Sequence, residues 1–363
     1  METRKLILED GSEYVGKAFG SESDKVLELV FNTSMVGYQE ILSDPSYTDQ
    51  AVVMTYPLMG NYGINDDDNE TEAPSIGALI AGTYTPEPSN FRCNQTLSDY
   101  MKKWDIAGIY GLDTRTITRK IRNYGSCKAL ITDGDMSLED GVKLLKETDL
   151  KRDQVSRVST KAVKTYEAVG QQQFHVVAVH CGIKHNIIRS LNKLGCKVTL
   201  VPFNSKPEDV DALKPDGIFL SNGPGDPTDV KETISLVSAL LGRFPIFGIC
   251  LGHQILSLAC GAKTYKLKFG HRGGNHPVVN LLTGKLEITS QNHSYAIEPS
   301  SIEGTGLTVT HKNLLDDTVE GVMAKDKKAF SIQYHPESCP GPEDSGYLFG
   351  EFIKLMKGEE IYA

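Results

Sequence analysis

A chain of 363 residues is long enough for two domains of ordinary size, each with its own core. Its composition, with 39% hydrophobic and 23% charged residues, is typical of a globular protein and excludes a disordered or fibrous class. The formal net charge of -9 argues against nucleic acid or an anionic membrane as a partner, because both carry negative charge themselves.

The N-terminus and the cysteines favour a cytoplasmic protein without a membrane anchor. METRKLILEDGSEY lacks the apolar core of a signal peptide, and a run of about 18 apolar residues occurs nowhere. The seven cysteines are odd in number and form no CxxC pair, which favours reduced thiols over disulfides or a zinc site. The acidic run DDDNETE lacks the glycine and terminal glutamate of a calcium loop, so we expect a solvated loop and no metal.

Residues 1–150 predict the smaller domain, of the α+β class. Strand-like runs alternate with turn-rich loops, and two stretches have helical periodicity. The strand-like runs are KLILED, SEYVGKAFG, LELVFNTS and AVVMTYP, and the helical stretches are LSDYMKKW and LEDGVKLLKE. The polar segment 151–173 has no periodicity and is predicted to be a linker.

Residues 174–363 predict an α/β domain built on a mostly parallel sheet with flanking helices. Short apolar strands alternate with helices, which is typical of βαβ units: FHVVAVHCG, GIKHNIIRSLNKLG, CKVTLVPF, GIFLSNGPGDP, DVKETISLVSALLGR, PIFGIC and LGHQILSLACG. After residue 262 short alternating segments predict antiparallel ribbons, followed by a last helix near GYLFGEFIKLMKG. Ligands of such sheets bind beyond the carboxyl ends of the strands.

Cys250 lies in GICLG, where a predicted strand gives way to a predicted helix. This is the pattern in which a sharp strand-to-helix turn presents a nucleophile above the sheet, and we expect its thiol to face solvent. The helix N-terminus favours the thiolate, which is the reactive form. A lone cysteine is more often a buried core residue, so the nucleophile hypothesis needs a base.

The segment SIQYHPE offers that base. In an extended chain alternate side chains share a face, so His335 and Glu337 would project together while Phe330, Ile332 and Tyr334 pack inward. His335 can transfer a proton near neutral pH, and Glu337 can orient its ring. The alternative is a surface histidine and glutamate at a strand end.

Acyl transfer also needs donors for an oxyanion. The candidates are the backbone N–H groups of Leu251, directly after the nucleophile, and of Gly223 in the loop SNGPGDP. That loop lacks the spacing of a phosphate-binding loop and could also be a plain turn. HRGGNH, residues 271–276, fits neither a metal nor a phosphate site and is predicted to be a structural loop beside the pocket.

In this order and spacing, LSNGPGDP, FGICLGHQ and QYHPE resemble the class I, triad-type glutamine amidotransferases. The N-terminal half, with VFNTSMVGYQEILSDPSYTDQ, TYPLMGNYGIN and GIYGLDTRTITRKIR, is similar to the small-chain family of carbamoyl-phosphate synthetases. The resemblance covers nearly the whole chain. It implies a catalytic triad of Cys250, His335 and Glu337.

The resemblance also implies which residues contact L-glutamine: Ser46, Gly223, Gly225, Leu251, Gln254, Asn292, Ser294 and Tyr295. Glycine and phenylalanine often stand at the positions of Ser294 and Tyr295 in the family, so only backbone contacts carry over there. His180 replaces a frequent aspartate, a change without a physical account.

The function implied is a glutaminase subunit that passes ammonia to a large synthetase subunit, which makes carbamoyl phosphate from bicarbonate and two ATP for pyrimidine and arginine synthesis. No segment resembles an ATP-binding domain, so no cofactor is expected in this chain and ATP and Mg²⁺ are expected on the partner. Residues 1–150 are implied to make much of the partner contact. Three alternatives stay open: the glutaminase of another synthetase, a γ-glutamyl hydrolase without a partner, and a non-catalytic binding subunit.

Overall fold

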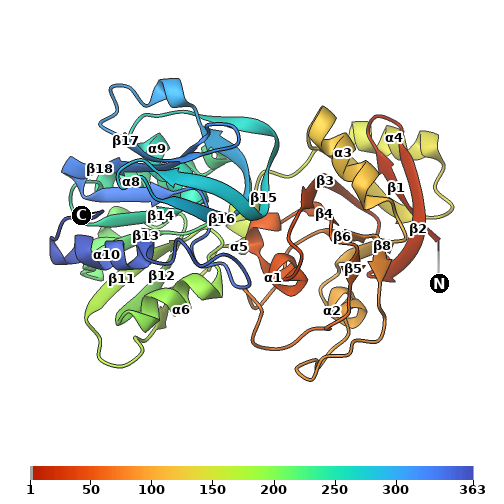
Figure 1. Ribbon diagram of the computed structural model, residues 1–363, viewed down its shortest axis with the longest axis horizontal. Helices are drawn as coiled ribbons and strands as arrows, with labels where there is room; N and C mark the ends of the chain where they lie inside the picture. The colour runs from red at the N-terminus through yellow and green to blue at the C-terminus, as the bar shows by residue number, and fades with distance from the viewer. Residues whose placement is uncertain (1–2, 363) are drawn as a thin grey trace. The chain divides into compact units, whose positions relative to one another are not determined.

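The computed structural model describes residues 3–362 and divides the chain into two compact units, Met1–Arg152 and Asp153–Ala363 (Figure 1). This division falls close to the predicted boundary at residue 150.

The first unit contains a closed β-barrel with the strand order β1-β2-β8-β6-β4-β3-β9. Its strands are β1 (Thr3–Leu8), β2 (Glu13–Gly20), β3 (Lys25–Asn32), β4 (Gln50–Met54), β6 (Ala78–Ala81), β8 (Ala107–Tyr110) and β9 (Cys127–Asp133). β1 pairs antiparallel with both β2 and β9, which closes the barrel, while β3, β4, β6 and β8 run parallel. Closure leaves no free edge on this sheet.

Helices pack on the barrel wall, α2 on β2 and β8, α3 on β3 and β4, and α4 on β1 and β9. The helical elements of this unit are α1 (Tyr38–Ser43), η1 (Pro45–Tyr47), α2 (Leu97–Lys103), α3 (Thr114–Tyr124) and α4 (Leu138–Glu147), and a short ribbon joins β5 (Leu58–Met59) to β7 (Thr83–Tyr84). Thr96, Asp113 and Ser137 each cap a helix by accepting a hydrogen bond from a backbone N–H in the first turn.

The predicted helices at residues 97–104 and 138–147 are confirmed, but α3 was not predicted. Its sequence, TRTITRKIRNY, buries Ile117 and Ile121 on an otherwise polar surface, too sparse an apolar stripe to stand out.

The second unit is built on a ten-stranded sheet with the order β10-β12-β11-β13-β14-β19-β18-β16-β15-β17. Its central strands are parallel: β12 (Cys196–Pro202), β11 (Phe174–His180), β13 (Gly217–Leu220), β14 (Ile246–Ile249) and β19 (Ala329–Ile332). Antiparallel strands extend it: β18 (Val319–Ala324), β16 (Leu286–Ile297), β15 (Thr264–Asn280) and β17 (Thr308–Asn313). The predicted α/β class, a mostly parallel sheet with antiparallel ribbons, is confirmed.

Each face of this sheet carries its own apolar core. Alternate residues of β11 serve both, since Val177 and Val179 belong to one cluster and Val176 and Ala178 to the other. Helices α8 (Lys231–Leu240) and α9 (Leu251–Ala259) contribute to the first cluster, and α6 (His185–Lys193) and α10 (Leu348–Lys357) to the second (Figure 1). The remaining helical turns are α7 (Pro207–Ala212), η2 (Pro227–Asp229), η3 (Pro299–Ser301) and η4 (Lys325–Lys327).

The structure differs from the predicted linker at 151–173. This segment contains α5 (Gln154–Val158) and β10 (Lys164–Tyr166), and from Asp153 it belongs to the second unit. The reason is that Val155 is buried in an apolar core, while β10 adds to the edge of β12 through backbone pairing.

All seven cysteines are free thiols, the state that the odd count and the lack of a CxxC pair favour. Among residues 3–362 no helix is both long and apolar enough to cross a membrane.

Replacing Ile117 by alanine is expected to lower the free energy of unfolding by about 3 kcal/mol, because this fully buried side chain would leave a cavity under α3. The matched variant Arg119→Ala changes an exposed position of the same helix and should stay within about 0.5 kcal/mol of the wild type. Urea denaturation followed by circular dichroism measures both, and equal losses would contradict the assigned helix face.

Candidate active site

Cys250 occupies a sharp turn between β14 and α9. Its backbone has φ 55° and ψ -105°, which non-glycine residues rarely adopt, and its N–H donates to the carbonyl of Ile332 at 2.9 Å. A Cβ at Gly252 would collide with the carbonyl oxygen of Leu220, and one at Gly248 would lie 2.7 Å from the carbonyl oxygen of Gly252. The two glycines of GICLG are therefore required by close backbone contact.

The thiol of Cys250 does not face solvent, so that prediction is wrong. The residue is 3% exposed, and its sulfur lies 3.5 Å from the carbonyl oxygen of Asn292 in β16. The antiparallel ribbon covers the sulfur, a contact between segments far apart in the sequence.

His335 and Glu337 form a buried hydrogen-bonded pair, with His335 Nδ1 2.8 Å from Glu337 Oε1. β19 ends at Ile332, so both residues lie in the turn beyond the strand rather than on it. The N–H of His335 donates to the carbonyl of Ser290 at 2.9 Å, which fixes this turn against β16.

The predicted alternation along this segment is confirmed as far as the strand extends. Phe330, Ile332 and Tyr334 lie in one apolar core. Ser331 and Gln333 point the other way, toward α9, where they hydrogen-bond His253 and Gln254.

Lys184 completes this arrangement, and sequence reasoning missed it. Its Nζ lies 2.5 Å from Glu337 Oε1, and the lysine side chain is only 7% exposed. Burial by itself raises the pKa of Glu337, but the charges of Lys184 and His335 outweigh it and lower the pKa to about 2. The sequence did contain a signal for Lys184, which is its position. The segment GIKHN follows the carboxyl end of β11, the edge of a parallel sheet where ligands bind.

The pKa of His335 is raised to about 10. Burial and the Lys184 charge lower it, but the charges of Glu337 and Cys250 and hydrogen bonding toward Cys250 raise it by more. Nε2 of His335 has no hydrogen bond of ordinary length within residues 3–362. Glu337 therefore holds His335 as an imidazolium through Nδ1, while Nε2 is left without a hydrogen bond among the described residues.

The loop SNGPGDP meets the start of α9, as an oxyanion site requires. A Cβ at Gly223 would lie 2.8 Å from Cδ2 of Leu251 and would collide with the carbonyl of Cys181. Gly225 has φ +87°, where a side chain would be strained.

The structure gathers most of the predicted glutamine-contacting residues around this turn. Gln254 Nε2 donates to the carbonyl of Tyr295 at 2.8 Å, and Ser294 Oγ accepts from Arg272 Nη2 at 2.5 Å. Asn292 borders the sulfur of Cys250. Ser46 belongs to the first unit, in η1, where its N–H donates to Asp44 Oδ1 at 2.9 Å.

HRGGNH is not a loop, so that prediction is wrong. Residues 271–276 lie within β15 and pair with β16 through two irregularities in register, which the glycines allow.

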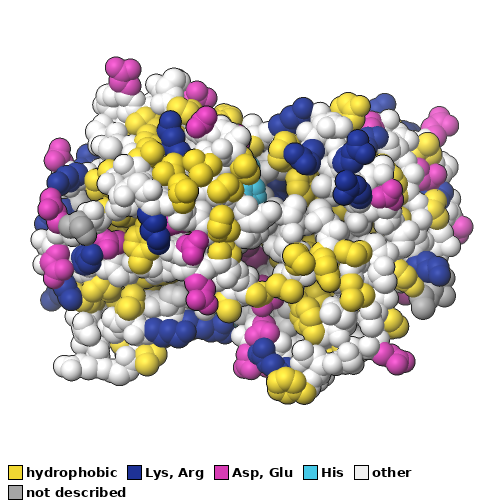
Figure 2. Space-filling view, viewed as in Figure 1, with side chains coloured by type: hydrophobic (Ala, Val, Ile, Leu, Met, Phe, Trp, Pro, Cys, Tyr) yellow, Lys and Arg dark blue, Asp and Glu magenta, His cyan; other side chains and the backbone are white. Residues whose placement is uncertain are grey.

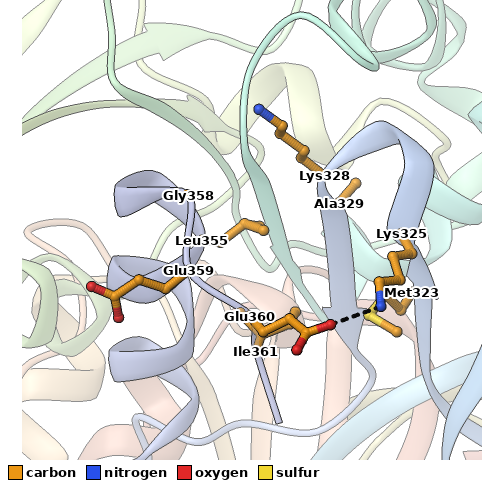
Figure 3. Close-up of a pocket in the computed structure, with 9 residues that line it drawn as sticks. All are labelled: Met323, Lys325, Lys328, Ala329, Leu355, Gly358, Glu359, Glu360 and Ile361. Atoms are coloured by element: carbon orange, nitrogen blue, oxygen red, sulfur yellow. Dashed lines mark hydrogen bonds and ion pairs between the residues drawn. The ribbon is translucent and has the colours of Figure 1, made fainter. Parts of the chain in front are cut away.

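A separate pocket lies at the C-terminal segment, between η4 and the end of α10 (Figure 3). Lys325 and Glu360 form an ion pair of 3.0 Å beside it. It is lined by none of the predicted site residues and is not the candidate active site.

Comparisons with known proteins match both units of the chain. The family model for glutamine amidotransferase class-I matches residues 176–355, and that for the carbamoyl-phosphate synthase small chain, CPSase domain, matches residues 6–131. A carbamoyl phosphate synthase small chain of Oceanobacillus iheyensis is 51% identical and covers 100% of both chains. One from Bacillus caldolyticus is 52% identical, covering 99% of this chain and 100% of its own. A carbamoyl phosphate synthase pyrimidine-specific small chain of Bacillus subtilis is 52% identical, covering 98% of this chain and 97% of its own.

Replacing Lys184 by methionine is expected to lower the free energy of unfolding by about 3 kcal/mol at pH 7, because Glu337 would lose one of its two buried cationic partners. The pKa of Glu337 is lowered in the fold, so its contribution to stability is full above pH 4.5 and disappears as the pH falls toward about 2. The difference between variant and wild type should shrink over that interval. The control Lys193→Met removes an exposed lysine from the same helix. Equal urea midpoints for all three proteins at pH 7 would refute the ion pair.

Proposed function

The chain belongs to the carbamoyl phosphate synthase small-chain family, and from this premise we propose that Cys250, His335 and Glu337 carry out the hydrolysis of L-glutamine in its amidotransferase domain. The chain is the glutamine-hydrolysing subunit of a ligase. What the proposal adds is the assignment of each step to residues.

The observation that carries the proposal is the buried pair of His335 and Glu337, 2.8 Å apart, beside the sharp turn that holds Cys250 at the start of α9. A protonated imidazole next to this sulfur favours the thiolate, the nucleophilic form. Glu337 accepts from Nδ1 at 2.8 Å, which leaves Nε2 as the ring nitrogen that handles the transferred proton.

In the first half-reaction the thiolate of Cys250 attacks the side-chain amide carbon of glutamine, and the amide oxygen becomes an oxyanion. The N–H groups of Gly223, whose loop packs against the Leu251 side chain, and of Leu251, the first residue of α9, are the donors that would hold it. As the C–N bond breaks, the imidazolium of His335 gives its proton to the departing nitrogen, and ammonia leaves a γ-glutamyl thioester.

In the second half-reaction neutral His335 takes a proton from water while the hydroxide adds to the thioester carbon. The same donors hold the second oxyanion, and its collapse breaks the C–S bond. Glutamate leaves, and the thiolate and imidazolium are restored, so the cycle closes without a cofactor in this chain.

Glutamine is held, in this proposal, by Ser46, Gly223, Gly225, Leu251, Gln254, Asn292, Ser294 and Tyr295, with Ser294 and Tyr295 acting through their backbones. The hydrogen bond from Gln254 to the Tyr295 carbonyl supports a fixed pocket edge on β16.

Replacing Cys250 by serine is expected to lower glutamine-dependent activity by more than about a thousandfold, because the nucleophile is lost. The assembled enzyme should still make carbamoyl phosphate from added ammonia, which shows that the variant folds. Cys260→Ser, at the other end of α9, should leave both activities unchanged. Glutamine-dependent synthesis by the Cys250 variant would refute the assignment.

The ammonia receiver in this proposal is a large synthetase subunit that binds ATP and Mg²⁺ and contacts residues 1–150. The first unit exposes large apolar side chains that a monomer would normally cover, at Met35 (68% exposed), Val36 (58%) and Phe91 (96%). Figure 2 shows hydrophobic side chains gathered on the viewed face of this unit. We place this assembly in the cytoplasm, where its carbamoyl phosphate would feed pyrimidine and arginine synthesis. The name of the pyrimidine-specific relative supports the first of these two uses.

Replacing both Met35 and Val36 by serine is expected to reduce the amount of large subunit that co-purifies with tagged protein by about tenfold, because apolar contact area is lost. The matched control replaces Val163 and Val169, two exposed valines of the second unit, by serine. A double variant that retains its full complement of large subunit would contradict the contact surface.

A further inference from the structure

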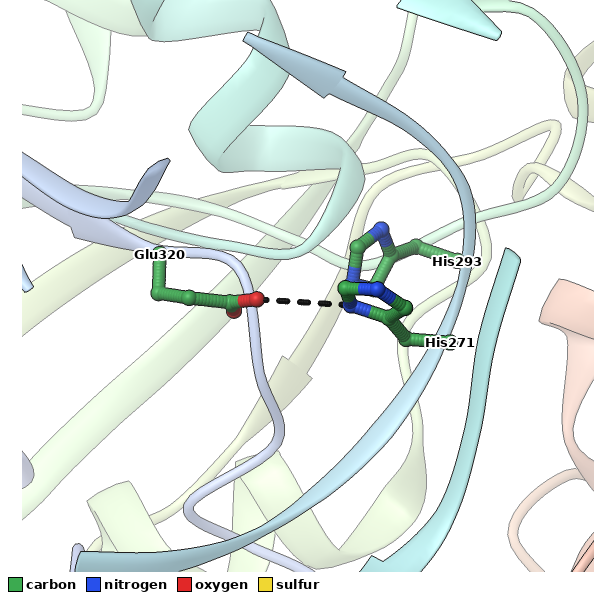
Figure 4. Close-up of side chains that lie close together, drawn as sticks. All are labelled: His271, His293 and Glu320. Atoms are coloured by element: carbon green, nitrogen blue, oxygen red, sulfur yellow. Dashed lines mark ion pairs between the residues drawn. The ribbon is translucent and has the colours of Figure 1, made fainter. Parts of the chain in front are cut away.

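Beside the candidate active site, three adjacent strands of the second unit bring together two histidines and a glutamate. His271 of β15 pairs in register with His293 of β16, and Glu320 of β18 points toward their rings (Figure 4). One nitrogen or oxygen of each residue lies within 4.8 Å of the others, and all three residues are buried. The proposed glutamine hydrolysis uses none of these side chains.

The outer nitrogen of each histidine is already held by an acceptor. His271 Nε2 lies 2.8 Å from Asp316 Oδ2, and His293 Nδ1 lies 2.8 Å from the carbonyl oxygen of Tyr295. Asp316 is itself held by the backbone N–H and hydroxyl of Thr318. This is the arrangement around metal-binding histidines, in which one ring nitrogen donates to a carboxylate or carbonyl and the other is free to bind the metal.

The inner nitrogens converge on a single oxygen. His271 Nδ1 lies 2.9 Å and His293 Nε2 3.1 Å from Oε1 of Gln291, whose amide nitrogen donates to Thr289 Oγ1. The carbonyl oxygen of Tyr295 only accepts, so Nδ1 of His293 carries the proton of the neutral ring and Nε2 presents a lone pair, which cannot form a hydrogen bond with the oxygen of Gln291. The lone pair of His293 Nε2 therefore faces a lone pair of Gln291 Oε1.

Glu320 supplies an independent indication. Its side chain is fully buried. Oε1 accepts hydrogen bonds from Asn313 Nδ2 and Thr318 Oγ1, both at 3.2 Å, and lies 3.5 Å from His271 Nδ1. Oε2 has no hydrogen-bond partner within residues 3–362. A buried carboxylate oxygen without a donor is costly unless a cation neutralises it.

We propose that His271, His293 and Glu320 bind a divalent transition-metal ion, with Gln291 Oε1 at the remaining position. Two imidazole nitrogens and a carboxylate oxygen form a donor set that zinc favours. Zinc bonds of about 2.0–2.2 Å hold tetrahedral ligands about 3.5 Å apart, so the donors, now within 4.8 Å, would move inward by about 1 Å. The carboxylates of Glu320 and Asp316 together balance the charge of the ion.

The ion would restrain β16, the strand that covers the sulfur of Cys250. The carbonyl of Tyr295 accepts from both His293 Nδ1 and Gln254 Nε2, and the carbonyl of Asn292 borders the sulfur of Cys250. The site therefore stabilises β16 and does not touch the reacting sulfur.

The test uses the full chain, stripped of metal with a chelator and titrated with Zn²⁺ against a chromophoric competitor. We expect one tightly bound zinc per chain and a higher melting temperature with zinc. Glu320→Gln should weaken zinc binding more than about a hundredfold. Asp316→Asn changes a partly exposed residue, so this variant should fold readily, and it should weaken binding about 10- to 100-fold. His175→Asn, which removes a histidine of β11, should bind as the wild type does.

Three results would overturn the proposal. The first is no zinc uptake by the wild type, which would mean that a proton or a reversed Gln291 amide satisfies the cluster. The second is zinc binding that the Glu320 and Asp316 variants leave intact. The third is binding that is lost in Cys250→Ala instead, which would place the metal on the nucleophile. None of these readouts depends on glutaminase activity.

Discussion

The close approach of α9 to β13 and β14 is the constraint on which the rest of the site depends. Gly252 lies against the backbone of Leu220 and Gly248 against that of Gly252, with no room for a Cβ at either position. The chain between them must turn sharply, and Cys250 takes up the turn with φ 55°. Its sulfur therefore sits at the N-terminus of a nine-residue helix, where backbone N–H groups and the helix dipole favour negative charge.

Behind that sulfur, three buried side chains of alternating charge follow one another into the domain. His335 carries a proton between Cys250 and Glu337, and Lys184 faces Glu337 from the start of α6. Each buried charge has an opposite neighbour, so desolvation, which alone would neutralise these groups, is offset. Glu337 thus stays ionised although it is buried, and it can hold the imidazolium in one orientation.

The long ribbon of β15 and β16 links this catalytic arrangement to the histidine cluster. Its residues cover the sulfur, accept a hydrogen bond from Gln254 and hold His271 beside His293. Breaks in the register at Lys266/His271 and Gly273/His276 allow the ribbon to turn its polar side chains inward, where an ordinary ribbon would bury apolar ones. A ligand bound at the cluster would act on the same strand that borders the substrate.

The sequence by itself determined those features that depend on residues close together in the chain. Periodicity located the first four barrel strands, two helices of the first unit and most elements of the second unit. GICLG with QYHPE pointed to Cys250, His335 and Glu337 as the candidate triad. It did not reveal α3, whose apolar stripe is only two isoleucines, nor closure of the barrel, which depends on β1 pairing with β9. Only the tertiary structure buried the thiol, brought Lys184 to Glu337 and gathered His271, His293 and Glu320. The reason is that each of these contacts joins strands or loops distant in the sequence, and their distances are set by sheet order and register, which a single sequence does not encode in any local pattern.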